Sequence, residues 1–377
     1  MTGKVVPAIA PADAVARLRL ARTDGIGPQT FRRLLERFGS AAAALEEMPG
    51  YGRGRLRAPP EAEALREMDA VAALGGSFLF LGTPGYPPLL DTLTDPPAVL
   101  ALLGDPAALG PRAVAVVGAR NASAAGRRIA DDLAESLAAH GLVVVSGMAR
   151  GIDAAAHQGA MRKGRTVAVV ACGLDQPYPP EHAPLQARIA AEGGAVLAEA
   201  PLGTAPHARH FPRRNRIVAG LSLGVVLVEA AVRSGSLITA RLGLEAGREI
   251  FAVPGSPLDE RCRGCNDLIR QGAHLTEGPE DVLAHLPQTP DSAPAFVFRP
   301  TARNMPAPAT RAGEAREPSG DEAQVLDLLG PSPIAVDDVL RRCQLSAPVV
   351  QAILLDLELS GRAEMLPGNR VALTGKG

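Results

Sequence analysis

Residues 210–222 read HFPRRNRIVAGLS, and residues 224–255 read GVVLVEAAVRSGSLITARLGLEAGREIFAVPG. The pattern predicts a helix with arginines in its first turn, a buried strand, and a second helix that begins at a Ser-Gly-Ser turn. No Asp or Glu occurs between Ala200 and Val228, although four arginines fall in that window. Because helix N-termini also present unpaired backbone N–H groups, this stretch is suited to bind a polyanion. The alternative is a solvated basic face.

Length and composition limit the class of protein. A chain of 377 residues with 46% hydrophobic residues can form two or three domains with a substantial core. No apolar run reaches the roughly 18 residues that span a bilayer, and the N-terminus lacks the layout of a secretory signal. Four cysteines do not make a disulfide framework in so long a chain. We therefore expect a cytoplasmic protein that does not act at a membrane.

The middle of the chain alternates buried strands with amphipathic helices. Between residues 111 and 286 the predicted strands are AVAVVGA, LVVVSG, TVAVVACG, AVLAEAP, GVVLVEA and EIFAVPG. Near-continuous Val and Ala runs that alternate with helices indicate a parallel sheet covered on both faces. We therefore predict a doubly wound, mainly parallel α/β domain over residues 111–286.

The flanking regions predict smaller units. Residues 12–72 carry apolar and basic positions at helical spacing and predict a small all-helical domain. Residues 73–110 are rich in proline and predict an ordered, extended connection, whereas residues 287–318 predict a flexible linker. Residues 319–377 show three helical patterns followed by a short hairpin, which is the layout of a winged-helix domain.

A Gly-Ile-Gly-Pro turn at residues 25–28 separates two helical patterns of the first domain. It looks like a helix-hairpin-helix turn, which gives backbone N–H groups to phosphates. Arg32, Arg33 and Arg37 follow on the next helix and suit the same role. A tight connection in a packing module is an equally good interpretation.

The turns that follow the strands are candidate binding sites, because ligands of open parallel sheets gather at the carboxyl ends of the strands. Glycines there allow close backbone approach, hydroxyls can donate to an anion, and Arg120 lies two residues beyond the first strand. For any single turn, a glycine that only permits a tight connection is the simpler explanation. The candidates are Gly118, Arg120, Ser123, Ser146, Gly147, Gly151, Gly235, Ser236 and Thr239.

The arginine-rich segment extends this candidate site. Pro212 suits the first turn of a helix, and the arginines that follow it must point in different directions. We expect one of them to pair internally with an acid such as Glu229. Asn215 suits a base edge or a turn carbonyl, and Phe211 suits either stacking on a base or a hydrophobic staple. The added candidates are Phe211, Arg213, Arg214, Asn215 and Arg216.

Several catalytic and cofactor-binding classes lack their motifs. The first turn reads GARNASAAG and not G-x-G-x-x-G, and neither a phosphate-binding P-loop nor a G-x-S-x-G elbow occurs. Asp153 and Glu229 are the best candidate acids, but Asp153 falls where a carboxylate simply complements a helix dipole. We therefore predict no catalytic residue and no cofactor.

Two further residue types have unremarkable explanations. We expect His157, after the helical GIDAAA, to be a packed or capping residue. Cys262 and Cys265 form a lone C-x-x-C without the second pair that a zinc ribbon needs. Unpaired thiols are the expected state, with metal binding as a minor alternative.

Several long motifs resemble the DNA-processing protein A family (DprA, also called Smf). They are GARNASAAG (118–126), SGMARGIDAAAH (146–157), CGLDQPYPPEH (172–182), the stretch 210–255 and GCNDLIRQGA (264–273). The resemblance implies a Rossmann-like core that binds single-stranded DNA in a positively charged pocket. It also implies a non-enzymatic homodimer that protects incoming DNA and loads a RecA-type recombinase onto it in natural transformation and recombination.

The resemblance assigns roles by position. Arg120, the segment 211–216, Gly235 and Ser236 match the family's DNA-pocket motifs. The helical N-terminal unit looks like the family's sterile-alpha-motif-like domain, and the C-terminal unit looks like its optional winged helix. One departure is Ala124-Ala125-Gly126, which stands where the family often has Tyr-Gly after the serine and so removes a polar or stacking contact.

Two other functions remain as alternatives. A nucleotide-processing hydrolase of the phosphoribohydrolase type has the same kind of sheet, but its Pro-Gly-Gly-x-Gly-Thr turn is replaced here by RSGSLIT at 233–239. A winged-helix regulator would read duplex DNA through APVVQAILLDLELSG at 347–361, which is poor in basic and amide side chains. The winged helix is therefore expected to pack against protein.

Overall fold

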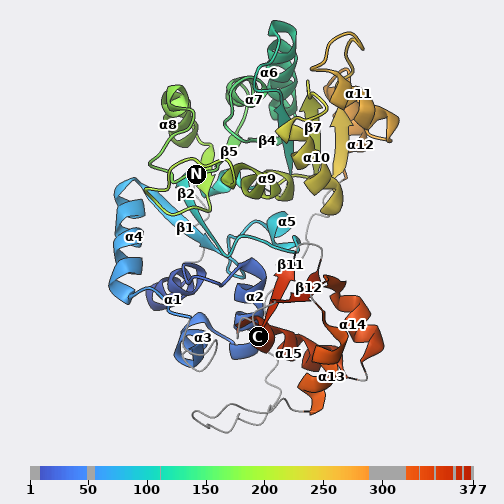
Figure 1. Ribbon diagram of the computed structural model, residues 1–377. Coiled ribbons are helices and arrows are strands. Elements are labelled where there is room, and N and C mark those ends of the chain that lie inside the picture. Colours follow the sequence, from blue (N-terminus) through green and yellow to red (C-terminus); the bar gives the residue numbers. More distant parts are fainter. Residues whose placement is uncertain are drawn as a thin grey trace. The chain divides into compact units, whose positions relative to one another are not determined.

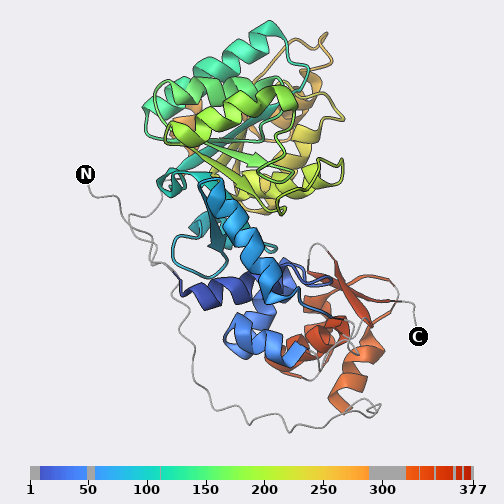
Figure 2. The same ribbon diagram turned by 90° about the vertical axis from the view of Figure 1, so that its left-hand side faces the viewer.

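The computed structural model describes residues 9–48, 56–110, 112–287, 320–330, 332–343, 345–359, 362–366 and 369–374. Contacts group the chain into two compact units (Figures 1 and 2). The first unit contains Leu65–Val297, and the second combines Ala10–Ala64 with Phe298–Gly377. The linker predicted at 287–318 lies, apart from Pro287, outside the described residues.

Within the described residues, the first unit forms a nine-stranded sheet in the order β1-β2-β6-β5-β4-β3-β7-β8-β9. The pairs from β6 across to β9 are parallel, which confirms the predicted mainly parallel α/β fold. The strands are β1 (Gly76–Phe80), β2 (Val99–Gly104), β3 (Ala113–Gly118), β4 (Val143–Ser146), β5 (Thr166–Val170), β6 (Ala195–Ala198), β7 (Gly224–Val228), β8 (Glu249–Ala252) and β9 (His274–Leu275).

The segment 73–110 differs from the extended connection that its sequence predicts. It contributes β1 and β2, which pair antiparallel with each other, and β2 also pairs antiparallel with β6. It further holds the short helix α5 (Pro88–Asp91) and the 3₁₀ turn η3 (Pro106–Ala108). Prolines stand just before β2 and not inside it, where they would remove ladder hydrogen bonds. The proline-rich composition therefore hid two short strands.

Helices cover both faces of the sheet. The helices α6 (Ala124–Ala139) and α7 (Ile152–Met161) bury Leu133, Leu137 and Ile152 against Val114 and Val116 of β3. The strand order reverses beside β3, so right-handed crossovers place α9 (His210–Gly220) and α10 (Gly235–Glu245) on the opposite face. The remaining elements of this part are α4 (Glu61–Ala73), η4 (Pro180–His182), α8 (Ala183–Ala191), α11 (Arg263–Arg270) and α12 (Pro279–His285).

The N-terminal part of the second unit is helical, as predicted. Its helices are α1 (Pro11–Ala21), α2 (Pro28–Phe38) and α3 (Ala41–Glu47). The turn before α2 uses a positive φ of 84° at Gly25, a conformation that other residues rarely adopt. Pro28 begins α2 and Gly39 ends it with a positive φ of 78°.

The C-terminal part of the second unit has the predicted winged-helix layout. A three-stranded antiparallel sheet in the order β10-β12-β11 packs with three helices around Val325, Val339 and Val350. The elements are α13 (Gly320–Leu328), β10 (Ile334–Ala335), α14 (Val336–Arg342), α15 (Ala347–Leu359), β11 (Ala363–Leu366) and β12 (Arg370–Leu373).

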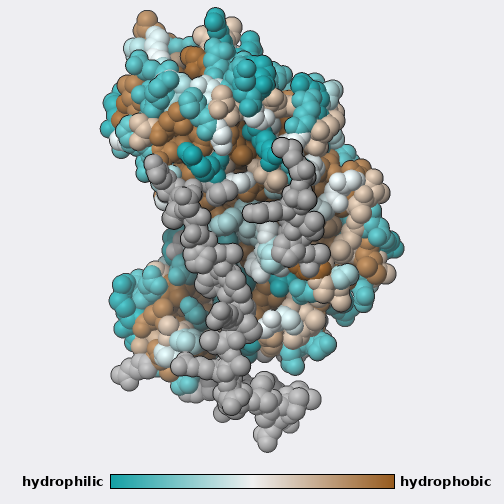
Figure 3. Space-filling view, turned by 180° about the vertical axis from the view of Figure 1, so that it is seen from behind, coloured by the Kyte–Doolittle hydropathy of each residue, from teal (hydrophilic) through white to brown (hydrophobic). Residues whose placement is uncertain are grey.

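Surface hydropathy and helix length bear on the expectation about membranes. Among the described residues, no helix combines the length and apolar character that a membrane span requires. The face drawn in Figure 3 intersperses hydrophilic and hydrophobic residues.

Candidate nucleic-acid interface

A pocket of about 770 Å³ opens at the carboxyl edge of the parallel strands. Its walls include the turn after β3, with Gly118 and Arg120, and the turn after β7, with Ser234 and Gly235. These two strands are neighbours at the point where the strand order reverses, so their turns diverge to opposite faces and leave a crevice. The pocket therefore lies at the rim that the sequence predicts.

Positive charge dominates this pocket. Four arginines line it, and Asp153 is the only carboxylate among the described lining residues. The arginines come from four different places in the fold: the turn after β3, helix α9, the turn after β7 and the turn after β8. They are Arg120, Arg214, Arg233 and Arg261. An excess of cations over anions in a concave site favours an anionic ligand.

Arg214 forms part of the pocket floor. Its side chain is 6% exposed, and Nη1 donates a hydrogen bond of 3.1 Å to the carbonyl oxygen of Val169. Gly147 lies directly against it, because a Cβ at that position would stand 1.5 Å from Nη1. Gly147 is not among the residues that line the pocket, and its position makes room for the guanidinium of Arg214.

Asp153 provides the negative charge beside Arg214. Its Oδ2 accepts hydrogen bonds from the backbone N–H groups of Gly147 (3.1 Å) and Ala149 (3.2 Å). Burial raises the pKa of Asp153, and the nearby charge of Arg214 opposes that shift. Burial likewise lowers the pKa of Arg214 from its ordinary value, which still leaves the guanidinium charged at neutral pH. Asp153 therefore orders the turn after β4 and balances a buried cation.

Three side chains build a stacked wall of the pocket. The guanidinium carbon of Arg120 lies 4.9 Å from the ring centroid of Phe211, which is a cation–π contact. Phe211 also contacts the ring of Tyr178 edge to face, with the ring centroids 5.7 Å apart. All three line the pocket, so a planar base can join a preformed platform.

The Ser-Gly-Ser turn brings a helix N-terminus to the same pocket. Ser234 caps α10, its hydroxyl oxygen accepts from the N–H of Ser236, and Gly235 and Ser236 line the wall. Asn215 of α9 donates from Nδ2 to the carbonyl oxygen of Gly235 at 3.3 Å, so its amide serves the turn. Thr239 lines the pocket one turn further along α10. The N-terminal end of the helix dipole adds to the positive potential.

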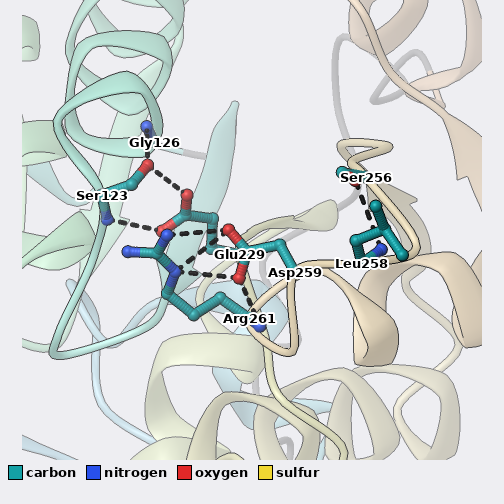
Figure 4. A network of polar contacts seen from close by, with 7 residues as sticks. All are labelled: Ser123, Gly126, Glu229, Ser256, Leu258, Asp259 and Arg261. Atoms are coloured by element: carbon teal, nitrogen blue, oxygen red, sulfur yellow. Dashed lines mark hydrogen bonds and ion pairs between the residues drawn. The ribbon is translucent and has the colours of Figure 1, made fainter.

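Glu229 holds the first turn in place (Figure 4). Its carboxylate accepts from the backbone N–H of Ser123 at 2.8 Å and from the hydroxyl of Ser123. A Cβ at Gly126 would lie 2.5 Å from the carboxyl carbon, so the glycine of Ala124-Ala125-Gly126 is needed for this approach. The expectation that Glu229 pairs with an arginine of the 213–216 segment is wrong, because its two oxygens serve Ser123.

Arg261 reaches the pocket from the turn after β8. Asp259 binds it through Nε (3.0 Å) and Nη2 (2.7 Å), and this ion pair lowers the pKa of Asp259 to about 2 (Figure 4). The pair fixes the guanidinium beside Ser123 and Glu229 (Figure 4).

Arg213 and Arg216 do not line the pocket, in contrast to the predicted site. Arg216 binds Glu199 through Nη2 at 2.8 Å and Asp95 through Nε at 3.0 Å. Arg213 binds the same carboxylate of Glu199 through Nη2 at 2.9 Å. The internal pairing that the sequence predicts for one arginine of this segment therefore involves two, and their partners are Glu199 and Asp95.

Three other predicted residues shape turns without lining the pocket. Ser146 is fully buried and donates from Oγ to the carbonyl oxygen of Val116 at 2.7 Å. Gly151 has a φ of 77°, and a Cβ there would lie 2.3 Å from the carbonyl oxygen of Ala119. Ser123 caps α6 and binds Glu229. At these positions the structure shows contacts that shape the turns, and their role in binding DNA stays a prediction.

The remaining titratable candidates have structural environments. His157 is fully buried, and its Nδ1 lies 2.7 Å from Oγ1 of Thr166, whose hydroxyl donates to the carbonyl oxygen of Val144. Burial lowers the pKa of His157 to about 3, which confirms a packed, neutral histidine. Cys262 and Cys265 are free thiols, and burial raises the pKa of Cys265 to about 12. Within the described ranges, no three His, Cys, Asp or Glu residues group as metal ligands do.

Several residues of the pocket wall were not among the predicted site residues, and they include Asn121, Tyr178, Arg233 and Arg261. Arg233 stands directly before the Ser-Gly-Ser turn, so the turn itself was a signal for it. Asn121 follows Arg120, and Tyr178 belongs to the turn after β5. Arg261 lies beyond the whole 210–255 stretch, and no local pattern points to it.

Comparison with known families gives this geometry its context. The family model for DNA recombination-mediator protein A matches residues 77–287, which include every strand of the large sheet except the first residue of β1. This chain belongs to that family. Models for the DprA-like N-terminal HHH domain and the DprA winged-helix domain match residues 11–70 and 307–369. The resemblance and the fold class inferred from sequence are confirmed.

Individual members of the family are similar over most of the chain. Protein Smf of Escherichia coli (strain K12) is 40% identical over 76% of this chain and 75% of its own length. Protein Smf of Synechocystis is 33% identical over 94% and 97%, respectively. Among solved structures, DprA of Streptococcus pneumoniae has a TM-score of 0.62 and 33% identity, covering 73% of this chain and 98% of that chain.

A second solved relative carries information about a ligand. DprA of Helicobacter pylori has a TM-score of 0.50 and 32% identity, and covers 55% of this chain and 94% of its own chain. That structure is described as showing a single-stranded DNA binding mode.

Proposed function

We propose that this chain binds single-stranded DNA in the pocket at the sheet rim and acts as a non-enzymatic recombination mediator. The observation that carries the proposal is the convergence of four arginines and the α10 N-terminus on a pocket with a single carboxylate among the described residues that line it. Membership of the recombination-mediator family and the single-stranded DNA bound by the Helicobacter pylori relative support the same ligand.

The pocket suggests how a single strand is held. Arg120 and Arg233 are exposed and neutralise phosphates with release of counterions, while Arg214 contributes charge from the floor. Bases stack beside Phe211 on the wall that it forms with Arg120 and Tyr178. A pocket of about 770 Å³ has the size of a small-molecule site, so it admits the nucleotides of one strand and excludes a duplex.

Membership of the recombination-mediator family supports a wider role. We propose that the bound strand is protected and passed to a RecA-type recombinase in the cytoplasm, in transformation and recombination. A homodimer would present two pockets to one strand and so raise the avidity of the complex above that of one pocket. Of the fourteen predicted site residues, this proposal includes those that line the pocket or shape its turns. Arg213 and Arg216 are not among them, because they pair outside the pocket.

The described residues of the pocket offer no suitable general base for a hydrolytic reaction. Asp153, its single lining carboxylate among the described residues, accepts two backbone N–H groups and faces a buried guanidinium. Incubation with nucleoside monophosphates should therefore release no free base, and release at an enzymatic rate would favour the phosphoribohydrolase alternative.

The direct test is binding of a fluorescent oligo-dT by the full-length chain and two arginine variants. Arg120→Ala removes a pocket arginine, and Arg213→Ala removes a neighbouring arginine that is paired outside the pocket. We expect the first variant to bind weakly and the second to bind as the wild type does. Equal binding by all three would reject the pocket. Stimulation of recombinase-catalysed strand exchange on the same DNA then tests the mediator role separately.

A further inference from the structure

Helix α2 presents a polar face outside the pocket described above. Thr30, Arg33 and Arg37 are spaced by three and four residues, so they lie on one side of the helix. The hydroxyl and the two guanidinium groups can all donate hydrogen bonds, and the two guanidinium groups are positively charged and cannot accept one. Such a face suits an anion with several acceptor oxygens.

In this structure, acidic residues of the winged helix occupy that face. Glu358 of α15 accepts from Oγ1 of Thr30 at 3.0 Å through one carboxylate oxygen and from Nη2 of Arg33 at 2.6 Å through the other. Asp356 accepts from Nη1 of Arg37 at 2.7 Å. The side chains of Arg33 and Glu358 are each 18% exposed, whereas that of Asp356 is 49% exposed.

The contact geometry resembles recognition of a phosphate. Each oxygen of Glu358 meets a different donor, as two oxygens of a phosphate would, and the guanidinium bond is charge-assisted. Gly25 and Gly27, in the turn before α2, are exposed. Their backbone lies next to the N-terminal end of α2, where a phosphate chain can approach it. The carboxylates therefore stand where an anionic polymer could bind.

Helix α15 is itself poorly suited to DNA. It is the third helix of a winged-helix domain, the position that usually enters a major groove. Its sequence, APVVQAILLDLEL, contains no Lys or Arg and carries the two carboxylates that meet α2. Duplex phosphates would repel this helix, so its polar side fits a basic protein face.

We propose that α2 carries a second binding site, for the backbone phosphates of duplex DNA, and that Asp356 and Glu358 of the winged helix keep it closed. DNA and the winged helix compete for the same donors. The Arg37–Asp356 pair is partly exposed and is therefore weak and screened by salt, whereas the Arg33–Glu358 pair, with each side chain 18% exposed, is the more buried contact that DNA must displace. This site is distinct from the single-strand pocket, and the proposal does not rest on the function of that pocket.

The first test opens the site from the acidic side. A full-length chain that carries Arg120→Ala, to weaken the pocket, is compared with the same chain carrying Asp356→Asn and Glu358→Gln. We expect affinity for a fluorescent duplex to rise roughly three- to tenfold, with a log–log salt slope steeper by about 0.9 per added phosphate contact. The matched control is Asp337→Asn with Glu364→Gln, which removes the same charge from exposed residues of the same domain. Equal affinity in variant and control overturns the proposal.

The second test separates a masked site from a merely structural contact. Arg33→Gln with Arg37→Gln breaks the same ion pairs from the α2 side. Hydrogen exchange should report comparable loosening of α15 in both double variants, but duplex affinity should rise only in the acidic one. If the arginine variant gains the same affinity, release of the winged helix and not α2 binds the duplex, and the proposal fails. Loss of oligo-dT binding by Arg120→Ala is scored separately, so failure of the pocket is distinguishable.

Discussion

The arginines at the sheet rim and the arginines of α2 share the same chemistry but differ in what neutralises them. At the rim, Arg120 stacks on Phe211, whereas Arg214 bonds to a carbonyl oxygen and has Asp153 beside it, and both arginines line the pocket. On α2, the charge of Arg33 meets a carboxylate of another domain. The same contrast occurs within α9, where Arg216 forms ion pairs with Glu199 and Asp95. Proximity to a helix terminus is therefore insufficient: Arg216 pairs with Glu199 and Asp95 and does not line the pocket, whereas Arg214 and Arg261 line it although each has a carboxylate beside it.

We expect the largest effect on DNA binding from a substitution at Arg120. Arg120→Glu places a carboxylate on the pocket wall in place of a cation, and we expect affinity for oligo-dT to fall roughly a hundredfold, the size of a lost charged hydrogen bond. Fluorescence anisotropy at fixed salt measures it. A loss below threefold, with an unchanged circular dichroism spectrum, would remove Arg120 from the interface.

Gly147→Ala tests whether the floor depends on one missing methyl group. The new Cβ would stand 1.5 Å from Nη1 of Arg214, so the guanidinium must move or the turn must shift. We expect the free energy of unfolding to fall by about 2 kcal/mol and oligo-dT binding to weaken with it. Gly110→Ala is the control, because nothing lies within 4 Å of a Cβ there. Equal urea midpoints for the two variants would contradict the packing described.

His157 and Arg214 are both buried basic side chains, but His157 is neutral whereas Arg214 is charged. Its pKa of about 3 in the folded chain lies below the ordinary 6.5, so the unfolded chain binds the extra proton between these values. Stability is thus complete above about pH 6.5 and is lost as the pH falls. From about pH 7 to about pH 5.5 the wild type should lose about 1 kcal/mol more than His157→Gln in urea unfolding. Parallel losses would show that His157 titrates normally.

The smallest expected effect is on salt dependence. For single strands, log affinity falls with log salt by about 0.7 for each phosphate neutralised. Arg120→Ala should therefore reduce the slope by about 0.7, and Arg213→Ala should leave it unchanged because that charge already meets Glu199. A reduced slope for Arg213→Ala would place that arginine on the DNA as well.

Local sequence pattern predicted the parallel sheet, the rim and the winged helix, because strand and helix periodicities are local. It missed β1 and β2 because their stability depends on pairing with β6, almost one hundred residues further along the chain. The fates of Arg213 and Arg216 depended on Glu199 and Asp95, whose positions only the folded chain reveals. Arg261 joined the pocket through a turn that no nearby motif marked. What could not be predicted from the sequence was therefore set by pairing between distant parts of the chain, and not by residue type.

Competition between single-stranded and duplex DNA tests the central claim most directly. The full-length chain is bound to labelled oligo-dT and titrated with unlabelled single strand or with duplex of equal length. The pocket predicts displacement by the single strand at far lower concentration than by the duplex, and almost no complex with Arg120→Glu. Equal displacement by the two competitors, or wild-type binding by Arg120→Glu, would contradict a rim pocket that holds one unpaired strand.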